Sequence, residues 1–197
     1  METSVARGTA RRILMATAAM ACCIGLATGG AFSQNKQTQK FQSSQDSLKK
    51  ALEKSRDEIK GTMALYNELL GGEAKKPDQT YKKLVQSVDK SSKSTNDIQK
   101  QRGSLEKEAV KFYQAWEKEI SAYSDPSFQE KGQQRMAAVK GRFDAFVTGM
   151  EDLRAMYEPF FAKMNDQVLF LGRDLSPEAL SVLRDVRITS RHRPPAR

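Results

Sequence analysis

Apolar residues recur at alternating steps of three and four between Tyr81 and Leu171, in two runs separated by residues 124–127. A mean step of 3.5 residues is typical of helices that wrap around one another in a left-handed coiled coil. Asp125 and Pro126 predict a tight turn into the second run, because aspartate is favoured as an N-cap and proline at the first helical position. The pattern therefore predicts two long antiparallel helices joined at this turn.

A shorter helix is predicted before this pair and a very short one after it. Apolar residues share one face from about residue 46 to Leu70, and the following glycine pair ends that helix, because glycine is favoured just past a helix C-terminus. Asp78 is the predicted N-cap of the first long helix. Residues 176–178, Ser-Pro-Glu, predict the start of the short helix. We expect an all-α, elongated antiparallel coiled-coil helical bundle: two long helices, a third covering about half their length, and a short fourth.

Two features interrupt the apolar repeats. Pro159 lies inside the second long helix, yet the repeat continues on both sides, which indicates a kink rather than an end. In the first long helix Ser91, Thr95 and Arg102 occupy core positions. We favour small and long polar side chains that fit where the neighbouring helix leaves room. A device that sets the register of the helices is the alternative.

Residues 1–33 have the pattern of an export signal. Three arginines precede an uncharged apolar stretch over residues 13–27, which is short for a membrane span. Small residues at the −3 and −1 positions predict cleavage after Ala31 or Ser33. We therefore expect an exported protein of the periplasm or cell envelope.

Other interpretations of this segment remain open. Residues 19–22 form an imperfect lipoprotein box, in which Cys22 would be lipidated and tether the protein to a membrane. Arg11 and Arg12 also fit a twin-arginine signal, and an uncleaved anchor is a further alternative. Both cysteines, Cys22 and Cys23, lie here, so cleavage after the segment would leave a chain without disulfides or thiols.

The residues flanking the predicted helical domain (46–187) are polar. We interpret residues 34–45 as a polar tether, with a frayed helix start as the alternative, and residues 188–197 as a disordered basic tail. The formal charge is +9, but most of it lies at the two ends, so a basic composition alone is weak support for nucleic-acid binding. Five arginines in residues 184–197 leave binding of an anionic membrane surface or a nucleic acid as the alternative function. Nucleic acid is disfavoured, because an exported protein seldom meets it.

No motif in the sequence predicts catalysis. Residues 71–76 lack the spacing and the Ser/Thr of a phosphate-binding loop. His192 is the only histidine and lies in the predicted tail, so Cys–His and zinc sites are not expected. We expect a protein that is not an enzyme, with no cofactor, no metal site and no small-molecule substrate.

Four short runs resemble the bacterial domain of unknown function 2959 family. They are residues 112–119, the Tyr-Ser pair at 123–124, the run PFF at 159–161 and the run DQVLFL at 166–171. The resemblance covers about residues 45–185 and implies an exported or lipid-anchored helical protein, but no activity. Members of the family continue the fourth helix for several more turns. In this chain the helical pattern fails after Val186 and gives way to Arg- and Pro-rich sequence.

The turn between the long helices is the strongest candidate for a binding surface. Folding the pair there brings five aromatic side chains close together. They fill the seam and cover one another, or they form a patch for a protein partner or a second copy. These residues are Phe112, Tyr113, Trp116, Tyr123 and Phe128.

The opposite end of the pair is predicted to be the thickest part of the bundle. In the run 166–171, residues 168–171 are apolar around more than half a turn, which is typical of a helix buried on several sides. We therefore expect structural packing there, with a binding groove as the alternative. The function predicted for the whole chain is that of a non-enzymatic structural or protein-interaction protein of the bacterial cell envelope.

Overall fold

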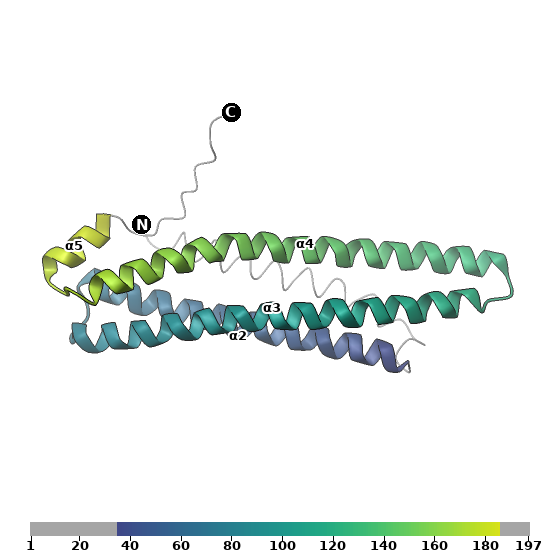
Figure 1. Cartoon of the computed structure of the whole chain (residues 1–197), viewed down its shortest axis with the longest axis horizontal. Coiled ribbons are helices and arrows are strands. Elements are labelled where there is room, and N and C mark those ends of the chain that lie inside the picture. The colour runs from purple at the N-terminus through teal and green to yellow at the C-terminus, as the bar shows by residue number, and fades with distance from the viewer. Residues whose placement is uncertain (1–34, 186–197) are drawn as a thin grey trace, which may run out of the picture.

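The protein is an elongated bundle of helices (Figure 1), and the computed structural model describes residues 35–185. The helices are α2 (Lys36–Gly71), α3 (Pro77–Ser121), α4 (Pro126–Leu171) and α5 (Pro177–Asp185). Within residues 35–185 every regular element is a helix, which confirms the all-α prediction. The three long helices lie side by side, and α5 folds back at the end of α4. The predicted signal segment and basic tail, with Val186, lie outside the described residues.

The predicted polar tether is wrong, because residues 36–45 form the first turns of α2. The side chain of Asn35 caps the helix by accepting the N–H of Gln37 at 2.9 Å. Phe41 is buried, and its ring stacks on that of Phe112 with centroids 4.9 Å apart. Burying this ring against α3 stabilises helical turns that are otherwise polar. With 36 residues against 45 and 46 for α3 and α4, α2 covers most of the bundle's length, not half.

The helix ends agree with the sequence predictions except at the start of α3. Gly72 closes α2 with φ 75°, a left-handed conformation that glycine adopts without strain. Lys76 precedes α3 without a side-chain cap bond, and Pro77 is the first helical residue, so the cap predicted at Asp78 is wrong. Proline is pre-organised for the first helical position, which places the helix start before Asp78. α4 continues through Pro159, as predicted.

α2 and α3 pack in one antiparallel register. Phe41 faces Phe112, and Thr62 faces Ser91, and the sequence numbers of the two pairs have the same sum. The core along this contact consists of two apolar clusters. The outer cluster is centred on the rings around Phe41, and the base cluster lies around residues such as Leu84 near α5.

A layer of hydroxyl groups lies on the α2–α3 contact near the base cluster. Thr62 Oγ1 donates to the carbonyl of Glu58 at 3.0 Å, and it lies 2.7 Å from the hydroxyl of Ser87 and 2.8 Å from that of Ser91. A hydroxyl has one proton and two lone pairs, so both serines donate to Thr62 and its bonding capacity is full. Thr62 and Ser91 are almost completely buried. Their hydrogen bonds offset the free-energy cost of burying polar groups.

The polar positions of the α3 seam fit the bundle in two ways. Ser91 and Thr95 are small and buried against α2. Arg102 is long, and its guanidinium extends from the seam to Glu106 and to Glu151 of α4. This arrangement agrees with small and long side chains that fit the available room, and the contact of Ser91 with Thr62 also agrees with the alternative of a device that sets the register.

α5 closes the base of the bundle. Its inward residues Ala179, Leu180 and Leu183 are buried. Arg184 donates from Nε to the backbone carbonyl of Leu70, in the last turn of α2. That carbonyl has no partner within its own helix, and a cation is favourable at this end of the helix dipole. α5 therefore packs across α2 as well as α4.

Gly132 marks a close approach of α4 to α3 near the turn. An added Cβ at this position would lie 2.9 Å from Cγ1 of Ile120, which is buried. We expect Gly132→Ala to destabilise the protein by about 1 kcal/mol, because overpacking outweighs the gain in helix propensity. Gly61→Ala is the matched control. Gly61 has nothing within 4 Å of the added atom, so this change should stabilise by about 0.5–1 kcal/mol in urea unfolding. A stabilising Gly132→Ala would contradict the close approach.

Candidate interaction surfaces at the two ends of the bundle

The turn between α3 and α4 is held by hydrogen bonds. Asp125 Oδ1 accepts the backbone N–H of Ser127 at 2.8 Å, as the cap prediction requires. Hydrogen bonds from the backbone and side chain of Ser127 favour the charged carboxylate, and they hold the pKa of Asp125 below its ordinary value. Gln129 Nε2 donates to the carbonyl of Tyr123 at 2.7 Å across the turn. The turn therefore has one defined conformation.

Two of the five predicted aromatic residues are exposed at this turn. Tyr123 is 49% exposed and Phe128 is 58% exposed, and their ring centroids lie 6.4 Å apart. Lys131 places its Nζ 5.9 Å from the centroid of the Phe128 ring, within the range of a cation–π contact. We call Tyr123 and Phe128 the tip pair.

The other three predicted residues belong to the interior. Phe112 and Trp116 are buried and Tyr113 is half-buried. Phe41 of α2 covers them from one side, and Phe143 of α4 lies 5.8 Å from Phe41 and 6.3 Å from Tyr113 between ring centroids. The structure therefore divides the five residues into three core rings and two surface rings, and they do not form one patch.

α2 reaches farther along the hairpin than the sequence predicts. Asn35 donates from Nδ2 to Glu119 Oε1 at 2.6 Å, two residues before the end of α3. Only the turn itself is therefore two helices thick. A signal for this was present in the sequence, because Phe41, Gln45 and Leu48 continue the apolar face of α2 at steps of four and three.

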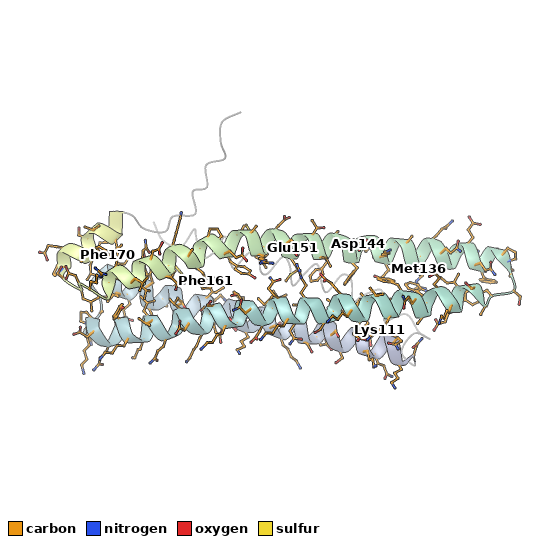
Figure 2. All side chains as sticks on the ribbon, viewed as in Figure 1. Lys111, Met136, Asp144, Glu151, Phe161 and Phe170 are labelled. Atoms are coloured by element: carbon orange, nitrogen blue, oxygen red, sulfur yellow. The ribbon has the colours of Figure 1, made fainter. Side chains whose placement is uncertain are left out.

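Polar contacts tie α3 to α4 in the middle of the bundle. Gln99 Nε2 donates to the hydroxyl of Tyr157 at 2.8 Å, and Arg102 pairs with Glu151. Burial raises the pKa of the Tyr157 hydroxyl, and the bond from Gln99 opposes this shift. Figure 2 shows Glu151 between the ends of α4, with Met136 and Phe161 on the side that packs against the neighbouring helices. These side chains therefore hold α3 and α4 together.

At the base, part of the 166–171 run packs as predicted. The hydroxyl of Tyr66 donates to Gln167 Oε1 at 2.6 Å in the interior. Tyr81 donates from its hydroxyl to the carbonyl of Val168 at 3.1 Å. An added Cβ at Gly172 would lie 2.5 Å from that hydroxyl, so the glycine leaves room for Tyr81.

The prediction that the whole run is buried on several sides is wrong. Leu169 is 70% exposed and Phe170 is 43% exposed, and Phe170 lies near α5 in Figure 2. Val182, on the outward side of α5, is 52% exposed. α5 is only nine residues long and turns its apolar side to α2 and the inner side of α4, so the outer side of this run has no cover. We call Leu169 and Phe170 the base pair.

The described residues offer little for small-molecule or metal chemistry. In residues 35–185 no group of three or more His, Cys, Asp or Glu side chains is placed to hold a metal ion. A cavity of about 10 Å³ near Thr95 and Tyr157 has room for no more than a water molecule. None of the four described helices is long and apolar enough to span a membrane.

These features define an antiparallel all-α helical bundle with exposed apolar side chains at both ends. A family model described as a protein of unknown function (DUF2959) matches residues 32–191, and the chain belongs to this family. The matched region contains every described residue, including the first turns of α2. Searches of curated proteins and of solved structures found no match.

Proposed function

We propose that this protein is a non-enzymatic helical rod of the bacterial cell envelope that binds a protein partner through its tip. The observation that carries the proposal is the tip pair. Tyr123 and Phe128 are both about half exposed, in a turn that hydrogen bonds hold in one conformation. Exposed aromatic rings on a rigid support are typical of the residues that dominate protein interfaces.

The rest of the molecule suits a spacer. α3 has 45 residues, so it spans about 68 Å at 1.5 Å per residue. Its inward side chains are used in contacts with α2 and α4, and α5 closes the far end. This architecture holds the tip pair at a fixed distance from the base. The envelope location rests on the sequence of residues 1–33.

Photo-crosslinking in cells tests the tip. A photoreactive residue in place of Phe128 should give a discrete crosslinked species, because a partner covers this side chain. The matched control is the same residue in place of Val110, which is 56% exposed on α3 away from the turn. Val110 should give no such species. Equal crosslinking at both positions, or none at Phe128, would count against the tip as a binding surface.

The intact mass of the protein isolated from its own cells tests the location. A chain that starts at Phe32 or Gln34 supports a free exported protein, and a lipid-modified Cys22 supports a membrane-tethered one. A chain that retains Met1 without modification contradicts the envelope proposal.

A further inference from the structure

We infer that the partner is a second copy of this chain, bound antiparallel along the exposed face of α4. The inference rests on the proposed function and names the partner of the same tip. The surface concerned runs along α4 from residue 131 to residue 170, on the side away from α3. We call it the α4 outer face.

The α4 outer face has no cover in the described structure. Its positions recur at steps of three and four, and all of them are exposed. Met156 is 38% exposed and Phe170 is 43% exposed along this face. Nearer the turn, Gly141 and Ala145 have at most a methyl group, so the face is shallow there. The exposed sides of α2 and α3 carry mostly lysine, glutamate and other polar residues instead. Exposed apolar side chains and small residues, interspersed with charged residues such as Lys131 and Asp166, suit a helical partner along this face.

The charges of α4 indicate that the partner is another α4 in the opposite direction. Residues 126–145 carry four cationic and two anionic side chains, whereas residues 146–171 carry two cationic and four anionic side chains. A parallel pair would place like charges together along the whole helix. An antiparallel pair places the positive half of each copy against the negative half of the other, which favours association. A twofold symmetric contact of one surface with itself is the commonest way in which identical chains pair.

The positions of the exposed residues define the register. When the twofold axis passes between residues 148 and 149, Lys131 faces Asp166 of the second copy, and Met156 faces Gly141 of the second copy. Nothing lies within 4 Å of a Cβ added at Gly141, so the methionine side chain has room there.

The same register accounts for the exposed residues at the two ends. Phe128 of one copy comes opposite Leu169 of the other, so each tip pair lies against a base pair. Phe128 and Leu169 are 58% and 70% exposed in the single chain. The dimer therefore covers both ends with one contact, which no pairing through the tips alone would do.

Sedimentation of the full chain over a roughly hundredfold range of concentration tests self-association, because a dimer dissociates on dilution. The unaltered chain should approach the mass of a dimer at the upper end of the range. Thr148→Arg, at the axis, should weaken association by at least about tenfold, because it places the long cations of the two copies close together at the centre of the contact. Ala137→Arg is the matched control. Ala137 is exposed on α4 at a heptad position that none of the contact residues shares, so this variant should associate like the unaltered chain.

A charge exchange tests the antiparallel register. Lys131→Glu should weaken association, because glutamate then faces Asp166 of the second copy. Adding Asp166→Lys to the same chain should restore it, since the pair is re-formed with opposite signs. In a parallel dimer residue 131 faces residue 131, and the double variant would not be restored.

Each outcome decides the inference. A chain that stays monomeric overturns it. So does a dimer that tolerates Thr148→Arg, or one in which the double charge variant does not restore association. In these cases a crosslink from Phe128 to a different protein would still support the proposed function. A crosslink from Phe128 to a second copy together with the restored double variant supports both.

Discussion

Replacing Trp116 by alanine is expected to lower the free energy of unfolding by about 3–5 kcal/mol, the usual cost of removing a large buried ring. Trp116 is 6% exposed and its ring centroid lies 5.6 Å from that of Phe112. The shortened side chain would leave a cavity beneath α2 that the surrounding helices cannot fill. Urea unfolding followed by far-UV circular dichroism measures the loss, because Trp116 is the only tryptophan and its fluorescence disappears with it.

Phe128→Ala is the control for this change. Phe128 was predicted to belong with Trp116 in one aromatic group, but it is 58% exposed. Its replacement should change the free energy of unfolding by no more than about 0.5 kcal/mol. If Trp116→Ala were as mild as Phe128→Ala, Trp116 would be a surface residue, and the division into three core rings and two surface rings would be wrong.

Phe41→Ala is expected to destabilise the protein by a similar amount, about 3–5 kcal/mol. The ring of Phe41 is 7% exposed and contacts rings on two other helices. It stacks on Phe112 at 4.9 Å and lies edge-on to Phe143 at 5.8 Å between centroids. Urea unfolding gives the size of the effect. Amide hydrogen exchange shows its place, since residues 36–45 should lose protection before the base of the bundle does.

Ser43→Ala is the matched control for Phe41→Ala. Ser43 is exposed in the same part of α2, so its replacement should leave both stability and exchange nearly unchanged. Comparison of the two variants shows whether residues 36–45 are a packed helix or a polar tether. If residues 36–45 were a tether, Phe41→Ala would be as neutral as Ser43→Ala.

The sequence predicts the α3–α4 hairpin well because its signals agree with one another. The apolar repeat runs almost without a break through both helices, and Asp125 and Pro126 give the turn a cap and a start. The first turns of α2 were missed because polar composition was given more weight than spacing. A helix at the edge of a bundle needs few buried side chains, and Phe41 and Gln45 supply them in an otherwise polar segment.

The surfaces could not be predicted from spacing alone. The fate of Trp116 depends on where α2 begins, and that of Leu169 and Phe170 depends on which side α5 covers. Four consecutive apolar residues, such as 168–171, give no periodicity from which to choose the buried face of the helix. Both surfaces are decided by the ends of neighbouring helices, where sequence signals are weakest.

The hydroxyl contact between Thr62 and Ser91 gives the rod a single length. If α3 slid along α2 by seven residues, Thr62 would meet Leu84 or Ile98 in place of Ser91. Thr62 would keep its bond to the carbonyl of Glu58, but Ser87 and Ser91 would lose Thr62 as a partner at a cost of about 1–3 kcal/mol each. A seam of leucines alone would present nearly the same surface after such a step. These hydroxyls therefore oppose sliding of α3 along α2, so the distance between the tip and the base of the molecule stays constant.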